Sequence, residues 1–164
     1  MHTWLCACVD ERIKVAAPMI GVQSFGWAVR NDQFHARVAS IPQVFNAAAG
    51  SMQKSEVDHE VVAAVWAKIL PGLLDFYDAP ISLPSLAPLP LLVVNGELDE
   101  RCPVEGLESV FEKTKKEYAW HGAGDSFSVR IEKDVGHVAT PDMKAAVLQW
   151  FDHHLLEGSV PEKD

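Results

Sequence analysis

Three short stretches of the chain have the hydrophobic pattern of β-strands. Residues 13–20 (IKVAAPMI) carry apolar side chains on both faces, and residues 91–95 (LLVVN) form a continuous apolar run, as expected for strands buried on both sides. In residues 127–132 (FSVRIE) apolar and polar positions alternate, which indicates a strand exposed on one face. The pattern therefore predicts three strands, the last of them near a sheet edge.

Between and after these strands, apolar residues recur at helical spacing. Helices are predicted over residues 2–9, 25–49 with a break near Pro42, 61–69, 104–121 and 141–156. Ser55, with an acid three residues later, is predicted to cap the start of the helix that contains residues 61–69. Residues 79–90 hold Pro80, Pro84, Pro88 and Pro90 and are predicted to be a rigid connector. Strands that alternate with helices predict an α/β fold, a parallel sheet with flanking helices.

The length and the charge limit the classes of protein to which the chain can belong. At 164 residues, residues 1–164 are expected to form a single domain, in which the helical segment 25–78 is part of a cap. The net charge of −9 makes nucleic acid and anionic membranes unexpected partners, because both bind clustered Lys and Arg. Three cysteines are a sparse, odd set typical of a reducing compartment. A cytoplasmic protein is expected, with an organelle left open because a transit segment would lie upstream of Met1.

Two polar residues follow predicted strands at positions suited to chemistry. Asp99 comes after the strand at 91–95, and His137 comes after the strand at 127–132. Because ligands of α/β sheets bind at the carboxyl ends of strands, we expect the two side chains to meet there, with the carboxylate orienting the imidazole. Glu97 and Glu100 are alternative partners for His137. The structural alternative is a solvated acidic loop without a catalytic role.

These two motifs and the closing helix resemble parts of a known superfamily. Residues 91–103 (LLVVNGELDERCP), 135–143 (VGHVATPDM) and the helix ending at 150–156 (WFDHHLL) are similar to α/β-hydrolases, especially prolyl-oligopeptidase-like and dienelactone-hydrolase-like members. The resemblance implies that Asp99 and His137 are the acid and the base of a Ser–Asp–His triad. It also implies a nucleophile on a Gly-x-Ser-x-Gly turn, which this sequence does not contain.

The resemblance therefore implies the C-terminal half of an α/β-hydrolase fold, without the N-terminal strands and the nucleophile elbow. The full-length parent would cleave ester, thioester or peptide bonds in a small-molecule or peptide substrate, without a cofactor or metal. This chain alone is expected to be inactive. The alternative is a non-catalytic truncated or alternative-start product, or an interaction protein that associates with itself through the exposed edge of its first strand.

Two further residues near these motifs have structural interpretations. Ser24, in residues 22–26 (VQSFG), follows a predicted strand and precedes a predicted helix, as a nucleophile does. Val22 replaces the leading glycine of the elbow, which argues against Ser24 as the nucleophile. The resemblance to α/β-hydrolases implies instead that this loop follows the next strand of the fold and lines the substrate pocket. Cys102 lies in the acid loop and is expected to be buried as a small apolar residue.

Overall fold

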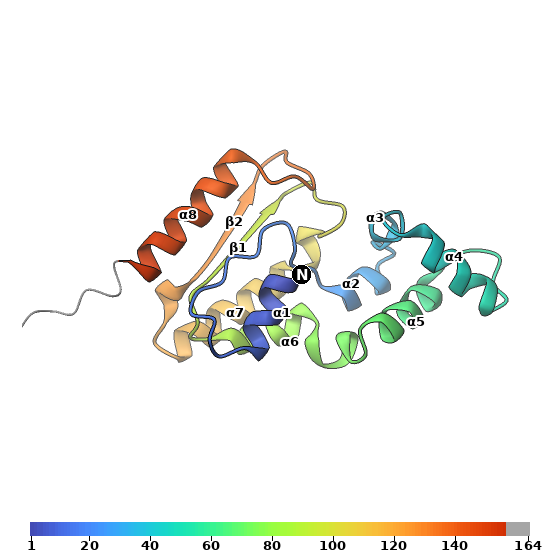
Figure 1. Ribbon diagram of the computed structural model, residues 1–164, viewed down its shortest axis with the longest axis horizontal. Helices are drawn as coiled ribbons and strands as arrows, with labels where there is room; N and C mark the ends of the chain where they lie inside the picture. Colours follow the sequence, from blue (N-terminus) through green and yellow to red (C-terminus); the bar gives the residue numbers. More distant parts are fainter. Residues whose placement is uncertain (157–164) are drawn as a thin grey trace, which may run out of the picture.

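The fold is a mixed α/β arrangement around a small parallel sheet. The computed structural model describes residues 1–156, in which eight α-helices accompany two strands. Strands β1 (Leu91–Gly96) and β2 (Phe127–Glu132) are parallel, with Leu91 opposite Phe127 and Gly96 opposite Glu132. Helix α7 (Glu108–Trp120) connects them (Figure 1). The predicted α/β class and both of these strands are confirmed.

Residues 13–20 do not form the regular strand that their hydrophobicity predicts. They run parallel to β1 and bridge it only at Ala16–Leu91 and Met19–Val94. The Ala16 N–H donates to the Pro90 carbonyl (2.8 Å) and the Ile20 N–H to the Val94 carbonyl (2.8 Å), but between them stands Pro18, which has no N–H. The ladder therefore lacks its middle donor. Ile20 then ends the extended stretch in a left-handed conformation, with φ 46°.

The two faces of the sheet are covered unequally. Helices α1 (His2–Val9), α6 (Ala79–Ser82) and α7 pack against one face around the main buried core (Figure 1). On the other face α8 (Pro141–Leu155) buries a smaller cluster of Ala17, Leu92, Val94 and Met143. In β2, Phe127 is buried while Ser128 and Arg130 are exposed, as the alternating pattern predicts. Among the described residues, no helix is both long and apolar enough to span a membrane.

The segment between residues 25 and 78 is helical and extends away from the sheet (Figure 1). Pro42 begins a new helix at the predicted break, and Asp58, rather than the predicted Ser55, caps the next one by accepting a hydrogen bond from the Val61 N–H (2.9 Å). The segment consists of α2 (Phe25–Arg30), α3 (His35–Val38), α4 (Pro42–Ser51), α5 (His59–Ile69) and the π-helix η1 (Leu73–Tyr77). Its role as a cap stays a prediction.

The connector that follows is more structured than its prolines suggest. Residues 79–90 contain the short helix α6 and the 3-10 turn η2 (Pro84–Leu86). Pro80 and Pro84 occupy the first turns of these elements, where the missing N–H has no intrahelical acceptor to lose. Proline therefore starts helical turns here rather than excluding them, and the rigidity of the connector stays a prediction.

One buried carboxylate joins the two ends of the helical segment. Asp78 accepts hydrogen bonds from the N–H groups of Phe25 (2.8 Å), Gly26 (2.8 Å) and Ala79 (2.9 Å). The carboxylate at the end of the segment therefore binds the N–H groups at its start, and Asp78 is only 4% exposed. Burial raises the pKa of the Asp78 carboxyl, and the N–H donors act in the opposite direction.

Replacing this carboxylate is expected to destabilise the fold. In Asp78→Asn an amide NH₂ faces a backbone N–H, so one buried donor loses its acceptor. We expect the free energy of unfolding in urea to fall by about 2–3 kcal/mol. Asp75→Asn, at an exposed position in the same segment, is the control and should change stability by less than about 0.5 kcal/mol. Equal effects of the two substitutions would contradict a closing role for Asp78.

Candidate functional site

The loops that follow β1 and β2 lie against each other. The N–H of Glu97 donates to the Glu132 carbonyl (2.9 Å), and the N–H of Leu98 donates to the Val135 carbonyl (2.8 Å). Gly96 makes this approach possible, since a Cβ there would overlap the Val135 carbonyl oxygen and lie 2.5 Å from that of Gly136. The strand order thus brings the acid loop and the histidine loop into direct contact.

The histidine loop is also fixed at its far end. Thr140 caps α8 by accepting a hydrogen bond from the Met143 N–H (3.1 Å), and its hydroxyl donates to Glu132 Oε2 (2.7 Å). The last residue of β2 and the first turn of α8 are therefore tied together. His137 lies in the short loop between these two points, which limits its movement relative to the sheet.

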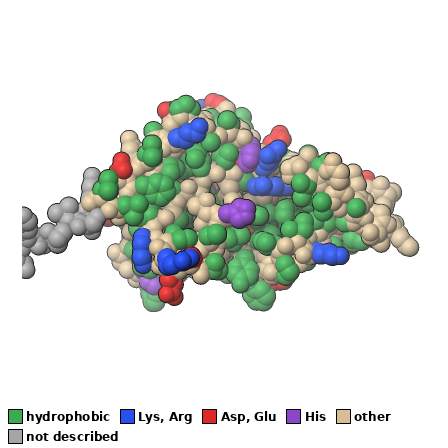
Figure 2. Space-filling view, viewed as in Figure 1, with side chains coloured by type: hydrophobic (Ala, Val, Ile, Leu, Met, Phe, Trp, Pro, Cys, Tyr) green, Lys and Arg blue, Asp and Glu red, His purple; other side chains and the backbone are tan. Residues whose placement is uncertain are grey.

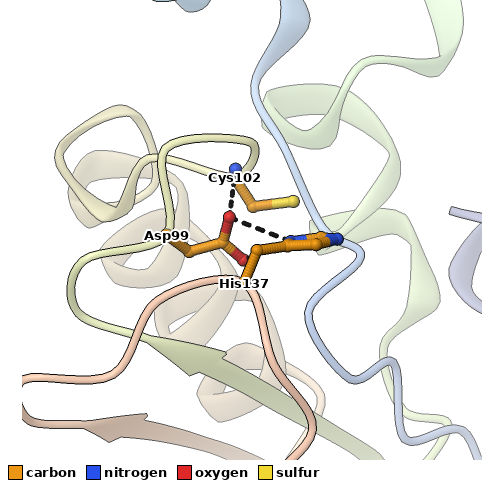
Figure 3. Close-up of side chains that lie close together, drawn as sticks. All are labelled: Asp99, Cys102 and His137. Atoms are coloured by element: carbon orange, nitrogen blue, oxygen red, sulfur yellow. Dashed lines mark hydrogen bonds and ion pairs between the residues drawn. The ribbon is translucent and has the colours of Figure 1, made fainter. Parts of the chain in front are cut away.

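Asp99 and His137 form a hydrogen-bonded pair at this edge (Figure 3). Nδ1 of His137 lies 2.8 Å from Asp99 Oδ2 and 3.0 Å from Oδ1. Asp99 Oδ1 also accepts the N–H groups of Arg101 (2.9 Å) and Cys102 (3.0 Å), so the carboxylate is fixed within its own loop. With the carboxylate ionised, Nδ1 carries the proton and Nε2 keeps its lone pair. The predicted contact of the two side chains is confirmed; a catalytic role stays a prediction.

The two rival acids make other contacts. The carboxylate of Glu97 accepts a hydrogen bond from the Asp134 N–H (3.0 Å) across the loops. Glu100 is exposed and makes no hydrogen bond to His137. The Asp99 side chain is fully buried, whereas the His137 side chain is 27% exposed. The pair is therefore a shielded acid behind an accessible base. Among the three acids of the loop, Asp99 is therefore the partner of His137.

Cys102 and Arg37 form a second polar group beside the pair, which the sequence did not reveal. The Arg37 guanidinium donates through Nη2 to Cys102 Sγ (3.0 Å) and through Nε to Gln23 Oε1 (2.9 Å) and the Arg101 carbonyl (3.0 Å). Cys102 is buried, as predicted. Burial raises the pKa of its thiol to about 11, although Arg37 acts in the opposite direction. Arg37 comes from α3, far along the chain, so no local motif indicates its place here.

Three side chains at this point could in principle offer ligands to a metal ion. One ligand atom each from Asp99, Cys102 and His137 lie within 4.8 Å of one another. The surroundings do not suit a cation, however. Arg37 brings a positive charge to the sulfur, burial keeps the thiol protonated, and Asp99 already accepts three donors. We therefore assign no metal site to this group.

His137 borders a pocket of about 310 Å³, while Ser24 does not contact it. The pocket is lined by Ala36, Ala39, Leu98, Glu100, Arg101 and His137. An apolar groove of about 400 Å³ between α4 and α5 lies away from the pair and contains none of these residues. Ser24 is buried at the N-cap of α2 and makes no hydrogen bond to His137, so the pair has no nucleophile among the hydroxyl groups that the structure describes.

No family model, curated protein or solved structure matches this chain. The relationship to α/β-hydrolases therefore rests on the order of the acid, the histidine and the final helix, and it stays a prediction.

The contact between the two loops should depend on the missing side chain at Gly96. We expect Gly96→Ala to lower the free energy of unfolding by about 2–3 kcal/mol and to abolish the downfield NMR resonance of the His137 Nδ1 proton. Gly124→Ala is the matched control, because a Cβ at Gly124 meets no atom within 4 Å. An unchanged Nδ1 resonance in Gly96→Ala would show that the loops tolerate separation.

The thiol of Cys102 should be unreactive in the native protein. At pH 8 we expect a maleimide to modify the exposed Cys6 at least about 100-fold faster than Cys102, because a buried thiol with a pKa of about 11 is almost fully protonated. Peptide mapping by mass spectrometry identifies the modified residue. In urea the two thiols should react at similar rates, and similar rates without urea would contradict the burial of Cys102.

Proposed function

We propose that this chain supplies the acid and the base of a serine-hydrolase mechanism that acts on ester, thioester or peptide bonds. The observation that supports this most is the hydrogen bond from His137 Nδ1 to the buried Asp99 carboxylate. A partly exposed imidazole backed by a buried carboxylate, at the carboxyl ends of parallel strands, is the arrangement of the acid–base half of a triad.

Each group then has a defined task. His137 Nε2 takes the proton of a nucleophilic hydroxyl as the nucleophile attacks the substrate carbonyl, and later gives that proton to the leaving group. Asp99 keeps the proton on Nδ1 and stabilises the imidazolium that forms. The N–H groups of Arg101 and Cys102 hold Asp99 in place. A substrate would approach through the pocket that His137 borders.

The described residues place no nucleophile beside His137. We place it in a Gly-x-Ser-x-Gly segment outside these 164 residues, since no hydroxyl of the described residues is hydrogen-bonded to His137. On its own the chain would then form no acyl-serine intermediate. The second candidate function is an interaction protein without catalysis. It is favoured by the backbone groups of Val15, Ala17 and Met19, which form no hydrogen bond among the described residues.

An ester assay tests whether the pair acts as a base. With nitrophenyl acetate we expect slow hydrolysis without a burst, about threefold or more slower in His137→Gln and in Asp99→Asn. His59→Gln removes an exposed histidine from α5 and should leave the rate unchanged. If His137→Gln had no larger effect than His59→Gln, the pair would have no role as a base.

Labelling with a fluorophosphonate probe tests the absence of a nucleophile. We expect no stoichiometric label, because the probe reports only an activated hydroxyl. A stoichiometric label that disappears in Ser24→Ala would make Ser24 the nucleophile and would place the whole triad in this chain.

A further inference from the structure

One peptide group in the acid loop is hydrogen-bonded on both sides. The C=O of Arg101 and the N–H of Cys102 belong to the same planar peptide group. Its carbonyl accepts a hydrogen bond from Arg37 Nε (3.0 Å), and its N–H donates to Asp99 Oδ1 (3.0 Å). A guanidinium and a carboxylate are therefore linked through a single peptide group.

Arg37 reaches this peptide group from the helical segment. It belongs to α3, and its half-buried guanidinium also donates to Gln23 Oε1 (2.9 Å) and to Cys102 Sγ (3.0 Å). Because Nε carries one proton, Gln23 Oε1 and the Arg101 carbonyl share it. Figure 2 shows basic, acidic and histidine side chains close together where the loops after β1 and β2 face the helical segment.

We propose that Arg37 is a positioning residue for the Asp99–His137 pair, on which it acts through this peptide group. We call the series of Arg37, the peptide group and Asp99 the relay. Hydrogen bonds in series polarise one another, so a charged donor on the carbonyl makes the N–H of the same peptide a stronger donor. For its part in catalysis this inference rests on the proposed function.

The relay changes how the carboxylate is shared among its donors. Asp99 accepts the N–H groups of Arg101 and Cys102 and the Nδ1 proton of His137. A stronger Cys102 donor draws negative charge towards itself, which leaves less of that charge for the bond to the imidazole. The relay therefore holds the carboxylate within its loop and moderates its pull on the Nδ1 proton, which leaves Nε2 as the basic atom of the ring.

The position of Arg37 in the chain also connects the pair to the pocket. Ala36 and Ala39, which flank this residue in the same turn, line the pocket that His137 borders. A group that occupies the pocket would contact the turn that supports the acid loop. The wall of the pocket and the support of Asp99 are thus parts of one element.

Proton NMR distinguishes the relay from a purely structural attachment of the loop. Arg37→Met removes every donor of the guanidinium. The Cys102 amide proton should then move upfield, while the His137 Nδ1 proton should move downfield, because the imidazole bonds to a carboxylate with more available charge. Arg12→Met removes an exposed arginine that bonds to Asp10, and it should move neither resonance.

Gln23→Met tests the relay in the opposite direction. Without the competing oxygen of Gln23, the Nε proton of Arg37 is left to the Arg101 carbonyl. The Cys102 amide proton should then move downfield and the His137 Nδ1 proton upfield, the reverse of the effect of the arginine substitution. Methionine is unbranched and flexible, like the buried glutamine that it replaces, so it can fill the same space.

The directions of the shifts decide the outcome. If both protons move upfield in Arg37→Met, the guanidinium only attaches the loop, and the proposal is overturned. Unchanged resonances in Arg37→Met and Gln23→Met would overturn it as well. Arg37→Lys keeps the charge with one donor group and should give smaller shifts in the same directions as Arg37→Met, so it serves as the test if Arg37→Met does not fold.

These resonances do not depend on turnover, which separates the relay from the proposed function. A chain that shows the opposite shifts but whose ester hydrolysis does not depend on His137 would support the relay and contradict the proposed function. A chain whose hydrolysis depends on His137 but that lacks the opposite shifts would contradict the relay alone.

Discussion

The absence of a side chain at Gly96 is the constraint on which the candidate site depends. Two parallel strands end side by side, and the loops that leave them would diverge if a Cβ at this position met the carbonyl groups of the histidine loop. Without that Cβ the loops exchange backbone hydrogen bonds, and the carboxylate of Asp99 reaches the imidazole of His137. The contact between the two side chains, which could carry chemistry, thus depends on a contact between the two backbones.

The surroundings of the pair are assembled from distant parts of the chain. Asn95, at the end of β1, donates to the Cys102 carbonyl (2.8 Å) and so fixes the far end of the acid loop. Arg37 reaches the same loop from the helical segment and contacts both the Arg101 carbonyl and the Cys102 sulfur. The acid loop is therefore held both by the sheet and by α3, while the imidazole of His137 in the neighbouring loop stays partly exposed.

The features that the sequence predicted correctly are those that depend on hydrophobic periodicity and on the order of strands and helices. Continuous or alternating apolar residues marked β1 and β2, and the rule that parallel strands share a carboxyl edge placed Asp99 beside His137. Hydrophobicity alone did not show that Pro18 interrupts the pairing of residues 13–20. The missing N–H of Pro18 matters only because this residue turns its backbone towards β1, which the hydrophobic pattern does not reveal. Ser55 and Asp58 are both good capping residues, and propensity alone does not decide that the helix begins after Asp58. The contact of Arg37 with the acid loop was not predictable, since Arg101 and Cys102 lie more than 60 residues away in the sequence.

The carboxylate of Asp78 has a consequence for how this architecture can vary. Because it binds backbone N–H groups where the helical segment begins and directly after it ends, Asp78 closes the segment into a loop whose two ends meet at one carboxylate. The entropic cost of closing such a loop grows only with the logarithm of its length. Insertions and deletions among its helices would therefore reshape the wall formed by Ala36 and Ala39 without altering the strand spacing. Ligand preference in this architecture can diverge while the acid and the histidine keep their geometry.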